Sequence, residues 1–282
     1  MVTAAYQIQP LAEKEVQLAV DWAAAEGWNP GLNDARLFYS ADTQGFLAGF
    51  LDGQPIATIS AIRYGKHFGF IGFYIVKPEF RGKGFGLRLW QAGMAQLAGR
   101  TIGLDGVVTQ QDNYLKSGFK LAYRNIRYQA LFSNFPVDNP SIAALNAVPF
   151  NMLTAYDSTC FFTPRPDFLR RWIDQSASRA VGYMANGALQ GYGVIRQCGT
   201  GYKIGPLFAD SPIIADQLLI ALASYAKGQT VFLDVPEPNA AAAALVNQHS
   251  MLPVFHTARM YTGDAPSINL NKVFGVTSFE LG

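Results

Sequence analysis

The stretch Arg81-Gly82-Lys83-Gly84-Phe85-Gly86 decides the fold of this 282-residue chain. It follows the apolar, strand-like run 70–76 and a short connector at 77–80, and a helical pattern begins directly after it. Glycines between the end of a strand and the start of a helix let the backbone bend tightly and approach a ligand closely. The unpaired amides of the new helix, together with the positive end of its dipole, then face an anion. The stretch therefore predicts a phosphate-binding loop.

Two glycine-rich phosphate motifs do not fit this loop. A Walker P-loop needs a hydroxyl residue directly after its lysine, and none follows Lys83. A dinucleotide fingerprint finds its first two glycines in Gly82 and Gly84, but Leu87 stands where the third belongs. Asp105 lies at a tolerable distance for the acidic residue of that fingerprint, yet the match stays incomplete. A plain solvated turn does not need glycine at three alternating positions, because each glycine costs backbone entropy.

A third pattern, R-x-x-G-x-G, is met by Arg81, Gly84 and Gly86, and the V-x-P of residues 76–78 precedes it. With its strand and helix, this stretch resembles the acetyl-CoA signature of the GNAT superfamily of N-acyltransferases. The resemblance implies that backbone groups at the strand end receive the pantetheine and the thioester, and that amides of the loop hold the pyrophosphate. The cofactor-binding residues expected on this basis are Tyr74, Ile75, Val76, Arg81, Gly82, Lys83, Gly84, Phe85 and Gly86.

A second motif lies at residues 113–119. Tyr114, Gly118 and Phe119 match Y-x-x-x-G-F, which ends the CoA-facing helix of a GNAT domain. In many members of that family the tyrosine protonates the leaving thiolate, so the resemblance implies this catalytic role for Tyr114. It also implies a contact between Asn113 and CoA. A phenol with an ordinary pKa near ~10 is protonated at neutral pH and suits a proton donor. The alternative is a half-buried tyrosine of a short helix without a chemical role.

The group that removes a proton from the acceptor amine is left open by the sequence. The strand before the loop holds no carboxylate. Glu26 and Asp34 flank a turn at Trp28, in the region that caps the acceptor site in the GNAT fold. Asp234 and Glu237 sit at a predicted strand end in the second half of the chain. Each acid is equally compatible with a helix cap or a surface charge, and a base acting through ordered water is a further alternative. The substrate-side candidates are Glu26, Trp28 and Asp234.

The order of predicted elements extends the resemblance over most of residues 1–132. Hydrophobic periodicity predicts a strand, two helices, three strands, a helix, a strand, a helix and a strand. This is the element order of the GNAT fold. The hairpin signal Asp52-Gly53 joins the second and third of these strands. We therefore expect residues 1–132 to form a GNAT acetyl-CoA-binding catalytic domain.

The second half partly repeats this pattern after a linker at 133–146, which carries Pro136 and Pro140. Residues 147–282 resemble a degenerate GNAT-like domain, as in members with a divergent second acetyltransferase-like domain. Its turn at 205–212 lacks R-x-x-G-x-G and places Asp210 where a phosphate would sit, so this half is not expected to bind CoA. The expected fold class is α/β (α+β), with two GNAT-like domains, each a central mixed, mostly antiparallel sheet flanked by helices.

Composition bounds the remaining possibilities. Apolar residues make up 50% of the chain and charged residues 15%, which is enough for a large core. The best long apolar stretch, 212–226, is interrupted by polar residues, and no secretory signal is recognisable. Cys160 and Cys198 have no disulfide or metal-ligand spacing. A net charge of +2 does not favour nucleic acid as a partner. We expect a cytoplasmic protein without a metal, acting away from membranes as a monomer or homodimer.

These patterns predict an N-acetyltransferase. It would move an acetyl group from acetyl-CoA to a primary amine of a small molecule by direct nucleophilic attack. Two alternatives stay open: a transferase for a longer acyl group, since cofactor motifs do not read the acyl chain, and a CoA-binding sensor or interaction module without turnover. The sequence names neither the acceptor amine nor the role of the second domain.

Overall fold

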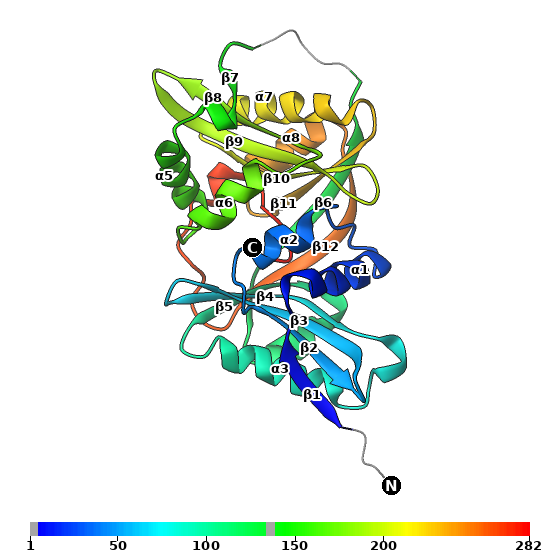
Figure 1. Ribbon diagram of the computed structural model, residues 1–282. Coiled ribbons are helices and arrows are strands. Elements are labelled where there is room, and N and C mark those ends of the chain that lie inside the picture. Colours follow the sequence, from blue (N-terminus) through cyan, green and yellow to red (C-terminus); the bar gives the residue numbers. More distant parts are fainter. Residues whose placement is uncertain (1–4, 134–138) are drawn as a thin grey trace.

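The computed structural model describes residues 5–133 and 139–282, and a sheet of 13 strands runs through both halves (Figure 1). The strands of the first half are β1 (Tyr6–Pro10), β2 (Phe46–Leu51), β3 (Gln54–Tyr64), β4 (Phe68–Val76), β5 (Thr101–Val107) and β6 (Lys120–Leu131). Those of the second half are β7 (Ile142–Ala144), β8 (Ser178–Ala185), β9 (Ala188–Gln197), β10 (Tyr202–Ala209), β11 (Thr230–Pro236), β12 (Leu252–Tyr261) and β13 (Val273–Gly275). The strand order is β1-β2-β3-β4-β5-β12-β6-β11-β10-β9-β8-β7, and β13 pairs with β10 off this path.

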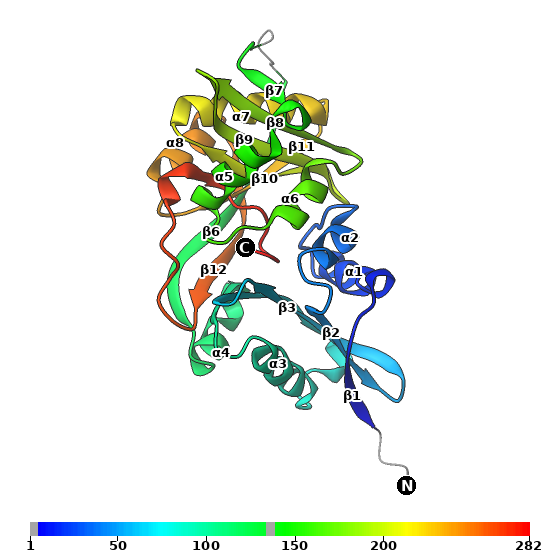
Figure 2. The same cartoon turned by 60° about the vertical axis from the view of Figure 1, so that its left-hand side comes forward.

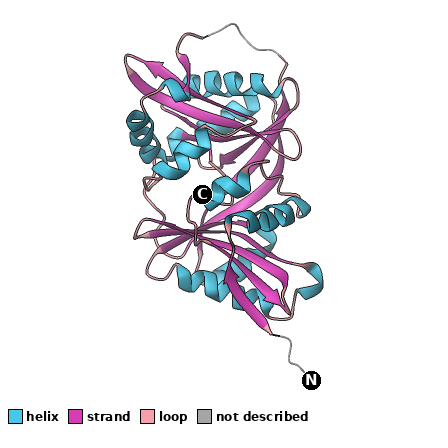
Figure 3. Ribbon diagram, in the orientation of Figure 1, coloured by secondary structure: helices cyan, strands magenta, loops and turns pink. Residues whose placement is uncertain are grey.

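Helices cover both faces of this sheet (Figures 2 and 3). In the first half α1 (Gln17–Ala25) and α2 (Asp34–Tyr39) lie on one face, and α3 (Phe85–Gln96) and α4 (Gln111–Lys116) on the other. The second half carries α5 (Phe150–Cys160), α6 (Pro166–Ile173), α7 (Pro212–Ala223) and α8 (Ala240–Gln248). Only the β4–β5 and β10–β11 pairs are parallel, so within the described residues the expected mixed, mostly antiparallel α/β fold is confirmed.

Alternation along the strands explains why both faces are covered. In β2, Phe46 and Ala48 pack in the core under α1 and α2, whereas Leu47 packs with α3 on the opposite face. Successive side chains of a strand point to opposite faces, so a strand apolar at consecutive positions needs a layer on each side. The core under α1 and α2 also contains Trp172 of α6, because these two helices lie between the two halves.

The two halves exchange a strand. β6, from the first half, pairs with β11 over its C-terminal part, from Asn125 opposite Pro236 to Leu131 opposite Thr230. β12, from the second half, pairs with β5 and with β6, and so lies between them. Figure 1 shows β6 and β12 running side by side from one half to the other. The division of the sequence at residues 132 and 147 therefore does not divide the sheet.

The proposed linker at 133–146 lies only partly within the described residues. Residues 134–138 are outside them, and Ile142–Ala144 forms β7, which pairs with β8. β7 and β8, like α5 and α6, are elements that the sequence patterns did not predict. With three residues β7 is too short for a hydrophobic pattern, whereas β8 and α5 were missed although they have 8 and 11 residues.

The first half opens where β4 and β5 part. Their parallel pairing covers only Phe68–Ile71 of β4, although β4 continues to Val76. Its pairing with β3 shifts register between Gly72 and Ile75, and Phe73 in this bulge has a φ of 47°. A positive φ is uncommon for a residue with a side chain, and bulges of this kind concentrate next to active sites, where they re-aim backbone groups.

The second half opens in the same way, but the gap is filled by the chain itself. β10 and β11 pair in parallel only from Tyr202 to Ile204 of β10. Beyond that point β13 pairs antiparallel with β10, and the amide of Val276 donates to the carbonyl of Asp234 in β11 (2.9 Å). A Cβ on Gly205 would overlap the carbonyl of Thr277, so β13 and the residues after it fit closely into this gap.

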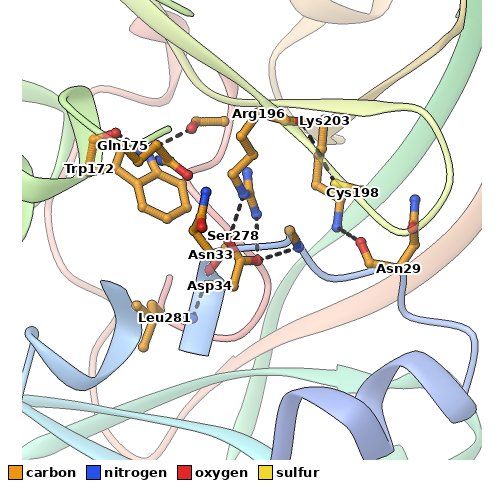
Figure 4. A network of polar contacts seen from close by, with 12 residues as sticks. Asn29, Asn33, Asp34, Trp172, Gln175, Arg196, Cys198, Lys203, Ser278 and Leu281 are labelled. Carbon is orange, nitrogen blue, oxygen red and sulfur yellow. Dashed lines mark hydrogen bonds and ion pairs between the residues drawn. The ribbon is translucent and has the colours of Figure 1, made fainter. Parts of the chain in front are cut away.

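After β13 the segment 276–282 crosses to the first half. The carbonyl of Glu280 lies against Gly72 of β4 so closely that a Cβ on Gly72 would overlap it. The hydroxyl of Tyr64 donates to the carbonyl of Leu281 (2.9 Å), and the amide of Leu281 donates to Ser278 Oγ (3.1 Å; Figure 4). The segment is thus held against the bulged part of β4.

Buried polar contacts also join the halves. Asp34 of α2 accepts from Arg196 Nε (2.9 Å) and Nη2 (3.2 Å), and both side chains are buried. Lys203 Nζ donates to the carbonyl of Asn29 at 2.9 Å, in the turn that follows α1 (Figure 4). A buried charge is costly unless it is paired or hydrogen-bonded, so these contacts fix how α1 and α2 sit on the second half.

Candidate active site

A cavity of about 630 Å³ lies where β4 and β5 part. The first half contributes the end of β4, the glycine loop before α3, the end of β5 and Tyr114. The second half contributes Phe255 and Thr257 from β12, and Phe279 and Glu280 from the segment 276–282. The exchanged strand therefore brings groups from both halves to one site.

The glycine loop presents backbone amides at one end of this cavity. Gly82 and Gly84 have φ values of 73° and 83°, which favour glycine, whereas Gly86 is required for space. A Cβ on Gly86 would lie 2.7 Å from the hydroxyl oxygen of Tyr74. Within the described residues, the backbone amides of 82–87 donate to no protein acceptor. The first backbone hydrogen bond at the start of α3 runs from the amide of Arg88 to the carbonyl of Gly84. This is the geometry of an anion site.

The two basic side chains of the loop differ in role. Arg81 donates from Nε to the carbonyl of Val76 (2.8 Å) and from Nη2 to Glu26 Oε1 (2.5 Å). It therefore ties the loop to the end of β4 and to the residue that follows α1. Lys83 lies over the ring of Phe80 (5.6 Å) and does not line the cavity. Its ammonium group could therefore attract a bound anion only from outside the cavity.

Tyr114 lies on the opposite wall. Its ring packs on Gly106 of β5, where a Cβ would overlap it, and 5.6 Å from the ring of Trp90. Burial raises the pKa of the Tyr114 phenol to about 12, and the neighbouring Tyr74 adds to this shift. Burial likewise raises the pKa of Tyr74 to about 12. Both phenols are therefore protonated at neutral pH and available as donors.

The end of the cavity away from the glycine loop is lined by aromatic side chains, and Arg127 of β6 contacts two of the aromatic residues there, Trp28 and Phe279. Arg127 donates to both carboxylate oxygens of Asp234 (2.6 and 2.8 Å) and from Nη1 to the carbonyl of Trp28 (2.7 Å). Its guanidinium lies 4.9 Å from the ring centre of Phe279. Burial raises the pKa of Asp234, but the charge and hydrogen bonds of Arg127 outweigh this and hold the pKa below its usual range. Asp234 thus positions Arg127 and through it Trp28.

Most of the residues predicted from the sequence meet at this cavity. The ones that line it are Tyr74, Ile75, Val76, Arg81, Gly82, Gly84, Gly86, Tyr114, Glu26 and Trp28. Four others, Lys83, Phe85, Asn113 and Asp234, are not on its wall. The Asn113 amide instead donates to Gln110 Oε1 (2.7 Å), and the carbonyl of Phe85 accepts from Tyr6 (3.1 Å).

Two further residues of the cavity, Thr257 and Glu280, were not predicted from the sequence. Both residues line the cavity, and Thr257 Oγ1 and Glu280 Oε2 are buried without a hydrogen-bond partner among the described residues. Buried polar atoms are nearly always paired, so unpaired ones in residues of a cavity wall indicate places for a ligand. The signal for Glu280 is a charged residue inside the run 273–282, whose other residues are all uncharged and buried.

Across the described ranges, no three His, Cys, Asp or Glu side chains cluster as metal ligands would. The helices of the same ranges include none of the length and apolarity needed to cross a membrane.

Known proteins match both halves. The model of the acetyltransferase (GNAT) family matches residues 4–119, and an acetyltransferase (GNAT) domain model matches residues 153–275. The holothin acyltransferase of Pseudoalteromonas sp. (strain SANK 73390) is 32% identical over 278 residues, 97% of this chain and 94% of that protein. The chain belongs to the GNAT family of acetyltransferases.

Other acetyltransferases are similar to this chain over most of its length. The uncharacterized N-acetyltransferase YitH of Bacillus subtilis (strain 168) is 28% identical over 233 residues, 80% of each chain. A solved Pyrococcus horikoshii structure assigned to the acetyltransferases superposes with a TM-score of 0.83 at 21% identity, over 100% of this chain and 98% of that one. A tandem GNAT protein of the clavulanic acid pathway has a TM-score of 0.63 at 13% identity, covering 93% and 100%. The chain is thus a tandem GNAT transferase, and an acyl-CoA is the co-substrate of this family.

Proposed function

We propose that this GNAT protein transfers an acetyl group from acetyl-CoA to a primary amine of a small molecule by direct attack. One observation carries the proposal: the free amides before α3, the parted strands β4 and β5, and Tyr114 all open into a single cavity. The loop would hold the pyrophosphate, and the unpaired side of β4 would receive the pantetheine, so that the thioester lies beside Tyr114.

Tyr114 then gives its proton to the departing sulfur. The raised pKa of its phenol suits this role, because the group is protonated at neutral pH and donates only to a strongly basic thiolate. Glu26 and Asn113 are not needed for the proton transfer. Glu26 holds Arg81, and Asn113 is turned to Gln110.

The acceptor would enter between the aromatic side chains Trp28, Phe255 and Phe279. Arg127 is already satisfied by Asp234, so this end offers no free cation for an acidic acceptor. A compact, apolar or planar amine fits these walls best. Because a relative covering nearly the whole chain is named for holothin, that compound is the first acceptor to test.

The test is acetyl-CoA titration by calorimetry, followed by thiol release with a panel of amines that includes holothin. We expect one acetyl-CoA bound per chain and turnover with at least one apolar amine. No binding at millimolar acetyl-CoA overturns the proposal, and binding without turnover over the whole panel supports a CoA sensor instead. Propionyl-CoA and longer acyl-CoAs, run in parallel, establish the preferred acyl chain. Residence in the cytoplasm and a monomeric or homodimeric state remain part of this proposal, tested by fractionation and light scattering.

A further inference from the structure

Glu280 stands apart from the other buried acids of the molecule. Its residue is 4% exposed, and it reaches the cavity from the segment 276–282. Asp34, Asp105 and Asp234 are each hydrogen-bonded by an arginine, but Glu280 Oε2 has no partner among the described residues. Leaving a buried carboxylate oxygen unpaired is costly, which is tolerated chiefly where a ligand supplies the partner.

The cations near Glu280 are already engaged. Arg127 bonds Asp234, Arg196 bonds Asp34, and Lys203 donates to the carbonyls of Trp28 and Asn29. The negative charge of Glu280 nevertheless contributes to raising the pKa of Arg127 and of Arg196, which places it within their electrostatic reach. The carboxylate is therefore surrounded by positive charge but not neutralised by a direct bond.

The backbone around Glu280 is held firmly. Its carbonyl packs on Gly72 at the β4 bulge, the next residue accepts from Tyr64, and Val276 is bonded to β11. Glu280 thus meets the cavity beside the part of β4 that pairs with β3 but no longer with β5, near the expected place of the thioester. A base fixed in this way needs no rearrangement before it acts.

We propose that Glu280 is the general base of the acyl transfer, a role that rests on the function proposed above. The acceptor enters as an ammonium ion and gives one proton to the Glu280 carboxylate. The neutral amine forms the C–N bond as the C–S bond breaks. Of its two remaining protons one stays on the amide nitrogen. The other is lost from nitrogen and passes to the Tyr114 phenolate, which restores the phenol that gave its proton to the sulfur. Glu280 then releases its proton to solvent.

The substrate class follows from this assignment. One unpaired carboxylate between aromatic walls selects an acceptor that carries a single basic amine on an apolar or planar body. An acceptor with its own carboxylate near the amine would meet Glu280 with like charge and bind poorly. We expect kcat/KM for such amino acids to be at least about tenfold below that for the decarboxylated amines.

The decisive variant is Glu280→Gln, which keeps the shape and removes the basicity. We expect kcat/KM at pH 7 to fall roughly 100-fold, in the range measured for general bases, with the Kd for acetyl-CoA unchanged. The deficit should shrink by about tenfold per pH unit toward the pKa of the acceptor, because solvent then supplies the neutral amine. The matched control is Glu13→Gln, the same change at an exposed acid of the first half, with wild-type turnover.

Glu280→Asp separates a chemical from a structural role. A base tolerates a shorter acid better than an amide, so Asp should retain more activity than Gln, whereas a role in packing would favour Gln. Glu280 interacts electrostatically with Arg127, Arg196 and Lys203. Besides Arg127 and Glu280, the charged residues on the cavity wall are Glu26, Arg81 and Asp105. Burial lowers the pKa of Lys203, so this amine could also titrate within the pH range of the assay. The pH profile of a Lys203→Met variant shows which change in activity is due to Lys203.

The outcomes distinguish the two proposals. Turnover of Glu280→Gln within about threefold of wild type, or a deficit that stays constant from pH 7 to 9.5, overturns the role of Glu280 while the transferase function stands. If the wild-type chain binds acetyl-CoA but acetylates no amine, the proposed function fails, and the role of Glu280 fails with it.

Discussion

The helices α3 and α7 begin at corresponding places in the two halves, and only one of them leaves its end free. Each has 12 residues and follows a strand that has just parted from its parallel neighbour. Before α3, the amides of residues 82–87 have no acceptor among the described residues. Before α7, Ser211 Oγ accepts from the amide of Ile214 (3.4 Å), and Pro212 has no amide hydrogen to offer.

The gap between the parted strands differs in the same way. Between β10 and β11 it holds β13, and beside it Asp210 is bonded by Tyr156 (2.9 Å) and Lys272 (2.9 Å). Between β4 and β5 there is a cavity. The second half therefore keeps the GNAT architecture but satisfies with its own chain what the first half leaves for a ligand. The following changes break or sharpen this difference.

The largest effect is expected from Gly84→Asp, which gives the first half the acid that the second half has. The carboxylate would occupy the anion site, and φ at this position is 83°. We expect the Kd for acetyl-CoA to rise roughly 100-fold or more, measured by calorimetry. Gly99→Asp is the control, because Gly99 has a similar φ of 78° and lies beyond the end of α3. Unchanged binding by the Gly84 variant contradicts the phosphate loop.

Tyr114→Phe changes the chemistry but not the loop. We expect kcat to fall roughly 100-fold, as for removal of a general acid. The Kd for acetyl-CoA should stay within about twofold of the wild-type value. Since burial raises the pKa of the phenol to about 12, the donor is lost only as pH rises toward that value. The pH profile of kcat should therefore show no fall due to Tyr114 below about pH 11. An alkaline limb near pH 9 that disappears in the Phe variant would contradict this assignment.

Gly205→Ala opens the filled gap of the second half. The added methyl group overlaps the carbonyl of Thr277 and must displace β13 or the residues after it. We expect a loss of about 2 kcal/mol in the free energy of unfolding, as for other overpacked sites, measured by urea denaturation. Because the same segment carries Glu280, turnover should fall as well, with acetyl-CoA binding retained. Gly263→Ala, where the new Cβ has ordinary contacts, should change neither.

The smallest effect is expected from Asp210→Asn. This change removes the ion pair with Lys272 and weakens the bond from Tyr156, at a cost of about 1 kcal/mol in the free energy of unfolding. It does not create a second CoA site, because β13 still fills the gap. Calorimetry should still give one acetyl-CoA per chain. A stoichiometry near two would show that the Asp210 carboxylate alone prevents acetyl-CoA from binding to the second half.

Local patterns predicted what is local. The strand-like run 70–76 lies within β4, and the predicted hairpin turn at Asp52-Gly53 joins β2 to β3, because periodicity and turn residues specify such elements. The loop 81–86 and Tyr114 were placed on the cavity for the same reason, since each belongs to a short motif. The alternation of apolar and polar residues along a strand does not say which strand it pairs with, so the pairing of β12 with β5 was not predicted.

The residues of the cavity end where the acceptor is proposed to enter were not predicted for a related reason. Asp234 was selected because it follows an apolar run, but its carboxylate is fully used by Arg127, which no pattern linked to it. Glu280 meets Gly72 across more than two hundred residues, and contacts of that separation carry no periodic signal. The sequence signal that could have identified Glu280 is chemical, because it is the one charged residue in a run that is otherwise uncharged and buried.

The exchanged strand has a consequence for how the molecule is made. β12 must lie between β5 and β6, so the first half cannot complete its sheet until residues 252–261 have left the ribosome. Until then the edges of β5 and β6 present unpaired backbone groups, which are sites for wrong association. The transferase therefore becomes a single cooperative unit only after β12 has been made, and its cavity is complete only when the segment 276–282, which also lines it, has followed.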